Sequence, residues 1–198
     1  MRKFFDMQLV LATHNKHKRD ELAAMLGSEF EIQILPDNFP EIEETGTTLT
    51  QNAMIKARSV FNVLHIPTLA DDTGLEVAAL GGAPGVFTAR YAGENATYEE
   101  NCKKLLYDLG QRSDRDAVFK TVLCFVNNDR SEEFFEGIVE GRIADIERGK
   151  NGFGYDPIFI PNEAKGRTFA EMTSAEKNAI SHRARAVGKF ARRIRNVK

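Results

Sequence analysis

The chain has 198 residues, the size of one domain or of one domain with two closely joined lobes, which excludes a long multidomain assembly. Apolar residues make up 42% and charged residues 28%, so the chain can bury a hydrophobic core and does not have the composition of a disordered protein. The net charge of -2 gives no general attraction for nucleic acid or for an anionic membrane, and any anion must therefore be bound locally.

The first third of the chain predicts two strands and two helices. The apolar run 8–12 predicts a strand, and the helical pattern that follows it places Leu22 and Leu26 on one face. A second extended run covers 31–35. Apolar residues at amphipathic spacing between Ala53 and Leu64 then predict a helix that Pro67 ends.

The middle of the chain predicts more β structure. Residues 68–70 predict a buried strand that ends at Asp71 and Asp72, and strand ends are where α/β sheets place ligands. A glycine-rich turn at 81–85 precedes a capping box at Thr97 that begins a helix ending near Leu109. Strands are predicted at 117–126 and 134–146.

The last part of the chain begins with a glycine-punctuated loop at 151–157, followed by the apolar segment 158–160. A second capping box, from Thr173 to Glu176, predicts the start of one long C-terminal helix. Because strands and helices alternate early and strands adjoin one another later, this order of elements predicts an α/β fold with a mixed sheet.

Two further features concern the cellular environment. Cys102 and Cys124 are far apart and match no metal-ligand spacing, so we expect two free thiols in a reducing compartment. The segment 1–5 begins like a secretory signal, but Asp6 and Gln8 interrupt its apolar stretch. No window approaches about 18 consecutive apolar residues. We therefore expect a cytoplasmic protein without a membrane span.

The loop after the first strand places Thr13, Asn15, Lys16, Lys18 and Arg19 at the N-terminus of a helix. Exposed backbone N–H groups and the positive end of the helix dipole favour an anion there. Cationic side chains oppose the dipole unless an anion lies among them, so the loop favours a phosphate site, with a solvated basic turn as the alternative. The G-x-x-x-x-G-K pattern of a P-loop is absent.

Two acidic doublets follow, Glu43–Glu44 and Asp71–Asp72. Two carboxylates directly after an apolar strand repel each other unless a cation, a lysine or a proton compensates them. Carboxylates without a His or Cys cluster nearby suit Mg²⁺, which proteins often hold with one or two carboxylates and the substrate's phosphates. Bound phosphates, a metal and an acid that activates water meet the needs of phosphoryl or nucleotidyl chemistry.

Three other segments could contact a ligand. Lys56, Lys177 and Arg183 could add phosphate or base contacts, with surface solvation as the alternative. The loop 153–156 offers two aromatic rings and a carboxylate to a flat ligand, unless it is only a tight turn with two core aromatics. The basic residues between 183 and 198 could bind nucleic acid, but Lys and Arg also favour a helix C-terminus, and we expect no nucleic-acid partner.

Six ordered motifs cover nearly the whole chain. They are Leu11-Ala12-Thr13-His14-Asn15 with Lys18, residues 43–48 with Asn52-Ala53 and Lys56-Ala57, Ala70-Asp71-Asp72-Thr73-Gly74-Leu75, residues 80–85 with Ala89-Arg90-Tyr91, Gly152-Phe153-Gly154-Tyr155-Asp156-Pro157, and Glu176-Lys177 with Ser181-His182-Arg183. In this combination the sequence resembles the Ham1-like inosine triphosphate pyrophosphatase family.

The resemblance implies an enzyme that hydrolyses non-canonical purine nucleoside triphosphates (ITP, dITP and XTP) to the monophosphate and pyrophosphate, and so cleanses the nucleotide pool of deaminated purines. It implies a single domain over 1–198, with an elongated mixed β-sheet flanked by helices and two lobes around a central substrate cleft. Mg²⁺ dependence and a homodimer are implied as well.

The resemblance also assigns roles to individual residues. Asp72 would be the catalytic proton acceptor, and Glu44 and Asp72 would hold the metal. Mg²⁺ lowers the proton affinity of a carboxylate, so Asp72 could act directly or through a metal-bound water, and Glu44, Asp71 or Glu41 remain alternative bases. The implied substrate-binding residues are Thr13, His14, Asn15, Lys16, His17, Lys18, Lys56, Thr73, Phe153, Gly154, Tyr155, Asp156, Lys177, His182 and Arg183.

Base selection follows from hydrogen bonding. A 6-keto purine presents an acceptor where adenine presents an amino donor, so donors such as Arg183, His182 or backbone N–H groups would be left unpaired against adenine. A Maf-like nucleotide pyrophosphatase with another base preference is the nearest alternative enzyme. A nucleotide sensor or a nucleic-acid-binding module without turnover is the alternative from another class.

Overall fold

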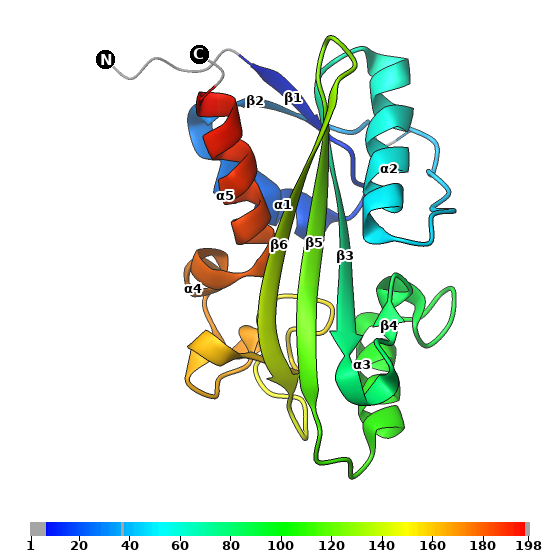
Figure 1. Cartoon of the computed structure of the whole chain (residues 1–198), viewed down its shortest axis with the longest axis vertical. Coiled ribbons are helices and arrows are strands. Elements are labelled where there is room, and N and C mark those ends of the chain that lie inside the picture. The colour runs from blue at the N-terminus through cyan, green and yellow to red at the C-terminus, as the bar shows by residue number, and fades with distance from the viewer. Residues whose placement is uncertain (1–6, 37, 197–198) are drawn as a thin grey trace. The chain divides into compact units, whose positions relative to one another are not determined.

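The computed structural model describes residues 7–36 and 38–196. Residues 1–6, which include the signal-like segment, and Lys198 of the basic cluster lie outside them. The strands are β1 (Gln8–Leu11), β2 (Glu31–Ile34), β3 (Thr68–Val77), β4 (Pro84–Gly85), β5 (Asp116–Val126), β6 (Glu132–Ile143) and β7 (Phe159–Pro161). The α-helices are α1 (Lys16–Leu26), α2 (Leu49–Leu64), α3 (Tyr98–Leu109), α4 (Ser174–Ile180) and α5 (His182–Arg195) (Figure 1).

The described strands form one seven-stranded sheet with the order β2-β1-β3-β5-β6-β7, and β4 pairs with β3 off this path. β1 pairs in parallel with β2 and β3, whereas the β3–β4 and β6–β7 pairs are antiparallel. The predicted α/β fold with a mixed sheet and flanking helices is therefore confirmed. No helix in the described part of the chain is long and apolar enough to cross a membrane.

The chain forms two compact units. The first comprises Met1–Asp72, Thr121–Gly137 and Arg183–Lys198, and the second comprises Thr73–Lys120 and Ile138–His182. β3, β5 and β6 each contribute residues to both units, and the boundary on β3 falls between Asp72 and Thr73.

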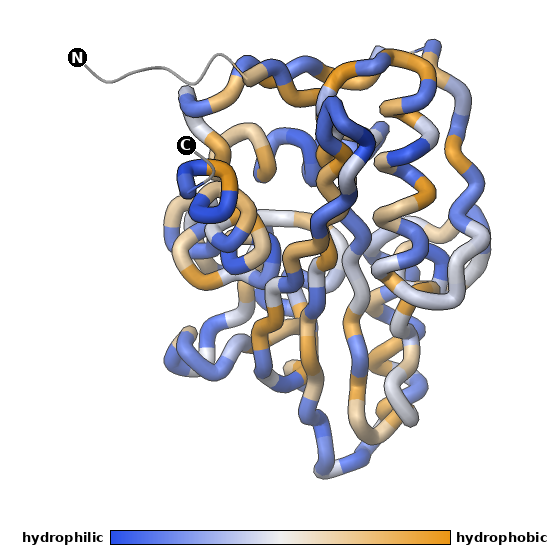
Figure 2. The backbone as a smooth tube through the Cα atoms, turned by 45° about the horizontal axis from the view of Figure 1, so that its top comes forward, coloured by the Kyte–Doolittle hydropathy of each residue, from blue (hydrophilic) through white to orange (hydrophobic). Residues whose placement is uncertain are grey.

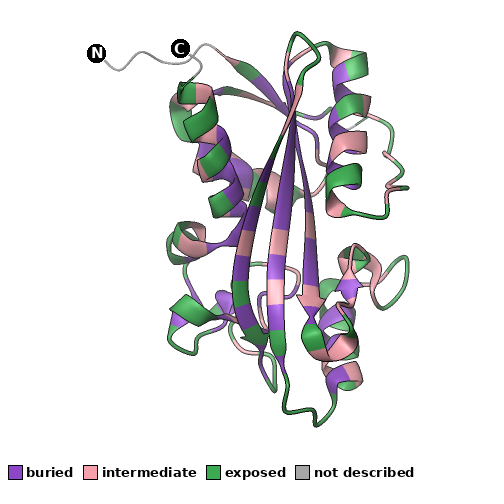
Figure 3. Cartoon of the chain, in the orientation of Figure 1, coloured by how far each residue is buried: buried purple, intermediate pink, exposed green. Residues whose placement is uncertain are grey.

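In the first unit, the sheet is covered on both faces. Successive side chains of a strand point to opposite faces, so Leu9 and Leu11 of β1 pack with α1 and α5, whereas Val10 between them packs with α2. β1 and β3 are buried along most of their length, β2 is exposed or half-buried, and each helix is buried on one side only (Figure 3). Hydropathy accordingly changes from residue to residue along the helices (Figure 2).

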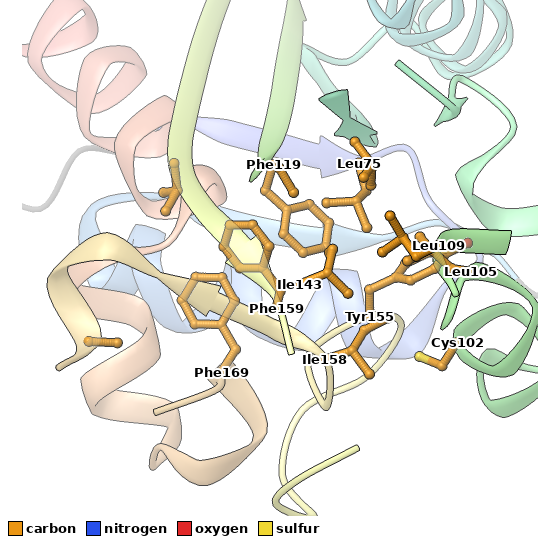
Figure 4. Packing of buried hydrophobic residues seen from close by; sticks show 14 of the residues in the cluster. Leu75, Cys102, Leu105, Leu109, Phe119, Ile143, Tyr155, Ile158, Phe159 and Phe169 are labelled. Carbon is orange, nitrogen blue, oxygen red and sulfur yellow. The ribbon is translucent and has the colours of Figure 1, made fainter. Parts of the chain in front are cut away.

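The second unit has its own aromatic core. The Phe159 ring lies 4.8 Å from that of Phe119 and 5.4 Å from that of Phe169, between centroids, and Tyr155 and Leu105 belong to the same buried cluster (Figure 4). α3 packs on this core through its buried face, and its predicted capping box at Thr97 is present. The core holds the loop 151–157 and the strand that follows it against the rest of the unit.

The structure corrects two predicted boundaries. The strand expected to end at the acidic pair continues through it to Val77, because Leu75 and Val77 remain buried beyond the acids. The single C-terminal helix is two helices, since Ser181 between α4 and α5 has an extended backbone with φ -66° and ψ 157°. Serine is a residue whose side chain competes with helical hydrogen bonding and favours such ends.

We expect Phe190→Ala to lower the free energy of unfolding by about 3–5 kcal/mol, because the fully buried ring contacts Phe30, Phe125 and Phe135 and leaves a cavity when it is removed. Phe134→Ala is the matched control, since Phe134 is largely exposed and should cost about 1 kcal/mol or less. Urea titration followed by circular dichroism measures both. Equal losses would contradict the assignment of Phe190 to the core.

Candidate functional site

The predicted site residues form two groups, one in each compact unit. The first unit contains Thr13, His14, Asn15, Lys16, His17, Lys18, Glu44, Lys56, Asp72 and Arg183. The second contains Thr73, Phe153, Gly154, Tyr155, Asp156, Lys177 and His182.

The basic loop of the first unit is a helix N-terminus, as predicted. Asn15 is the N-cap of α1, and its Oδ1 accepts hydrogen bonds from the backbone N–H groups of His17 and Lys18 at 3.0 and 3.2 Å. The Asn15 N–H donates to Thr13 Oγ1 at 3.2 Å. The first turn of α1 contains no acidic residue, so this helix end keeps its preference for an anion.

Asp71 and Asp72 point to opposite faces of β3, because neighbouring strand residues alternate. Asp71 Oδ2 lies 3.3 Å from Lys18 Nζ and 3.1 Å from Arg183 Nη2, whereas Asp72 Oδ1 accepts from Lys56 Nζ at 2.8 Å. The negative charges of Asp71 and Asp72 are therefore compensated by basic side chains, with Lys18 and Arg183 on one face and Lys56 on the other.

Arg183 has a fully buried guanidinium that joins two carboxylates. Nη1 donates to Glu21 Oε2 at 2.5 Å, and Nη2 and Nε donate to Asp71 Oδ2 at 3.1 and 3.3 Å. Burial alone would raise the pKa of Asp71, but the charges of Lys18 and Arg183 outweigh it and hold that pKa well below its ordinary value. Asp71 is thus a poor proton acceptor.

Glu21 was not among the site residues predicted from the sequence, although one signal points to it. Glu21 is three residues after Lys18 on α1, so the two side chains share a face of that helix. Unless another cation pairs with it, Glu21 would repel the anion that Lys18 is expected to bind. Arg183 is that cation.

On the other face, Lys56 bridges Glu44 and Asp72. Its Nζ donates to Glu44 Oε1 and to Asp72 Oδ1, each at 2.8 Å. The loop that carries Glu44 is fixed to α2, because the Gly46 N–H donates to Oδ1 of the buried Asn52 at 2.8 Å. A Cβ at Gly46 would lie 2.5 Å from that oxygen, so only glycine fits.

The titration of this pair differs from that of Asp71. Burial raises the pKa of Asp72 above its ordinary value, and Lys56 and Lys18 offset only part of that effect. Burial would lower the pKa of Lys56, but the charges of Asp72 and Glu44 reverse this and raise it. Of the alternative bases, Glu41 is exposed, and no contact joins it to this group in the described structure.

The carboxylates on this face fit a hard divalent cation. Asp72 Oδ2 is buried and has no hydrogen-bond partner among the described residues. Glu44 Oε1 and Asp72 Oδ1 both contact one nitrogen, so they lie at most twice 2.8 Å apart. Within the described ranges no three His, Cys, Asp or Glu side chains form a group that could hold a metal ion.

The second unit gathers Phe153, Asp156 and Lys177. Asp156 Oδ2 accepts from Lys177 Nζ at 2.5 Å and from the Phe153 N–H at 2.8 Å, and Lys177 Nζ lies 4.8 Å from the centroid of the Phe153 ring. Gly152 has a φ of +75°, and a Cβ there would lie 2.0 Å from Asp156 Oδ2. Glycine at position 152 therefore allows the Asp156 carboxylate to lie against the backbone of its own loop.

The other predicted residues of this unit are held mainly by the core. Tyr155 is buried and its hydroxyl donates to the Thr88 carbonyl oxygen at 3.0 Å, so only Phe153 of the two loop aromatics is left half-buried. The imidazole of His182 stacks on Phe119 with centroids 4.5 Å apart and an interplanar angle of 7°. Thr73 is half-buried on β3.

The two cysteines are not among the predicted site residues, although Cys102 Sγ donates to the Gly154 carbonyl oxygen at 3.4 Å. Both are free, as predicted, and both are buried, which raises the pKa of each thiol to about 12. They therefore remain protonated and poorly reactive at neutral pH.

We expect Glu21→Gln to lower the free energy of unfolding by about 3–5 kcal/mol, because it removes one partner of the buried Arg183. Glu29→Gln makes the same chemical change in the exposed Glu29–Arg195 pair and should cost about 1 kcal/mol or less. Thermal and urea unfolding of both variants measure the difference. A loss for Glu21→Gln no larger than that of the control would refute the ion network around Arg183.

Known proteins resemble this chain over most of its length. The Ham1 family model matches residues 9–193. A dITP/XTP pyrophosphatase of Thermoanaerobacter sp. (strain X514) is 48% identical over 93% of this chain and 94% of its own. A dITP/XTP pyrophosphatase of Christiangramia forsetii is 50% identical over 89% of this chain and 93% of its own.

Solved structures of Ham1 proteins resemble this chain as well. The Ham1 protein of Staphylococcus aureus superposes with a TM-score of 0.86 at 38% identity, covering 96% of this chain and 100% of its own. A HAM1 protein of Coxiella burnetii gives a TM-score of 0.85 at 44% identity, covering 96% of this chain and 99% of its own. By its sequence motifs, its fold and these matches, the chain belongs to the Ham1 family.

Proposed function

We propose that this protein hydrolyses non-canonical purine nucleoside triphosphates (ITP, dITP and XTP) to the monophosphate and pyrophosphate, and so removes deaminated purines from the nucleotide pool. The names of the dITP/XTP pyrophosphatases that it resembles support this activity. The observation that carries the proposal is the group formed by Glu44 in the loop before α2, Lys56 on α2 and Asp72 on β3, with Lys18 and the N-terminus of α1 in the same unit.

The polyphosphate is assigned to the cationic groups around Asp71 and Asp72 in the first unit, where the charges of Lys18 and Lys56 act on both acids. The positive end of the α1 dipole and the ammonium groups of Lys18 and Lys56 supply positive charge, and neutralising phosphate charge is the main requirement of this chemistry. Thr13 and Asn15 keep the loop in the conformation that exposes the helix end.

Asp72 is assigned as the proton acceptor. Hydrolysis adds water across the bond between the α and β phosphates, and the water must lose a proton as it attacks. Asp72 has a buried oxygen without a hydrogen-bond partner in the described chain and a raised pKa, whereas the pKa of Asp71 is held low. Of the two neighbouring acids, Asp72 is thus the better base.

Mg²⁺ is the proposed cofactor, held by Glu44 and Asp72. When bound, the ion would neutralise charge on the phosphates and the leaving pyrophosphate. The protein's own contribution is to hold the two carboxylates in place through Asn52, Gly46 and the burial of β3.

The base is assigned to the second unit. The half-buried ring of Phe153 offers a stacking surface for a purine, and the nearby Lys177 and His182 are donors that suit a 6-keto group. We also propose that residues 1–198 act as one functional domain, in a cytoplasmic homodimer.

A substrate panel tests the activity. We expect ITP, dITP and XTP, incubated with the protein and Mg²⁺, to be cleaved much faster than the four standard triphosphates, with pyrophosphate as the released ion. Release of orthophosphate alone, or a preference for other bases such as a Maf-like enzyme would show, would contradict the proposal. Tight ITP binding without any product would favour a nucleotide sensor, and salt-dependent DNA binding would favour a nucleic-acid-binding module.

Asp72→Asn tests the assigned base. We expect the variant to stay folded but to lose turnover by about 10²–10⁴-fold, the usual contribution of a general base. Initial rates with ITP measure the loss, and circular dichroism checks the fold. A variant with full activity would remove Asp72 from this role.

A further inference from the structure

Lys56 occupies a position that conflicts with tight metal binding. Its ammonium lies 2.8 Å from one oxygen of Glu44 and 2.8 Å from one oxygen of Asp72, the two carboxylates assigned to the metal. The Lys56 and Asp72 side chains are only 10% and 7% exposed, so water screens their charges poorly. The lysine is therefore an internal counter-cation for both acids.

The position of Lys56 is fixed by its helix. Its neighbours on α2, Ala53, Ala57 and Val60, are fully buried against the sheet, so the stem of the lysine emerges at a set place. Asn52, one helical turn earlier, holds the loop that carries Glu44. α2 thus positions one of the two carboxylates and also the ammonium that neutralises both.

The charges can be counted. Glu44, Asp72 and Lys56 together carry one negative charge, and a divalent ion bound to both acids would leave a net positive charge in a poorly screened place. The ion would also have to share its carboxylates with an ammonium a few ångströms away, and like charges at that distance repel each other strongly when water is excluded. A polyphosphate chain brings several negative charges, which would compensate both the divalent ion and the ammonium of Lys56.

We propose that Lys56 prevents tight metal binding to the enzyme alone and so makes the metal and the polyphosphate bind together. The inference rests on the proposed function and concerns how its site is filled. By linkage, the polyphosphate strengthens metal binding by the same factor as the metal strengthens polyphosphate binding. Lys56 is the residue on which this coupling depends.

Direct titration with Mn²⁺, followed by its EPR signal, tests the proposal without any turnover. The wild-type protein should bind Mn²⁺ weakly alone and at least about tenfold more tightly when saturated with inorganic pyrophosphate. Lys56→Met should bind Mn²⁺ alone at least about tenfold more tightly than the wild type, and the further gain from pyrophosphate should be smaller than in the wild type. Removing the charged group of Lys56 should therefore strengthen Mn²⁺ binding.

Two further variants serve as controls. Lys120→Met removes a lysine that lies 2.7 Å from a single acid, Glu76, in the second unit, and it should leave Mn²⁺ binding unchanged. Lys56→Arg keeps the charge and should bind Mn²⁺ alone as weakly as the wild type does. Tightening in either control would show that the effect does not come from the charge of Lys56.

Stability gives a second readout if Lys56→Met is only marginally folded. An ion that binds the folded state more tightly raises the melting temperature more, so Mn²⁺ should stabilise Lys56→Met by more than it stabilises the wild type. Unchanged or weaker Mn²⁺ binding by Lys56→Met, together with no extra stabilisation, would overturn the inference. That result would leave the proposed activity intact if the wild type still releases pyrophosphate from ITP, whereas a wild type that does not cleave ITP refutes the activity.

Discussion

The compensation of two adjacent carboxylates is the constraint on which the first unit depends. Asp71 and Asp72 lie in the middle of a buried strand, where an uncompensated charge would cost several kcal/mol. Strand alternation sends them to opposite faces, and each face supplies its own cations, from α1 and α5 on one side and from α2 on the other. The positions of all three helices around β3 are thereby tied to the acids.

Asp71 and Asp72, on the two faces of β3, differ in the direction of their pKa shift although both are aspartates. Lys18 and the buried Arg183 both pair with Asp71, so its pKa falls and its role is structural. Asp72 shares one lysine with Glu44 and keeps a buried oxygen without a partner in the described structure, so its proton affinity rises. Such a difference between neighbouring acids is what separates a structural carboxylate from a reactive one.

Much of the fold could be predicted from local patterns. The periodicity of α2, the capping boxes at Thr97 and Thr173 and the strand–loop–helix at residues 8–26 all depend on neighbours in the sequence, and the structure confirms them. The contacts of Arg183 with Asp71 and Glu21 join residues more than a hundred positions apart, and no local pattern contains them. The extension of β3 beyond the acids was missed for the same reason, because Leu75 and Val77 are buried by residues that other elements supply.

The buried cysteines have a practical consequence for work on this protein. Both thiols are closed off from solvent and remain protonated at neutral pH, so maleimides and other alkylating reagents should react with them slowly. A single cysteine introduced at an exposed position, such as that of Tyr107 on α3, can then be labelled with a fluorophore or spin probe while both native cysteines are retained. Two such positions labelled together would allow a distance to be measured on an otherwise unmodified chain.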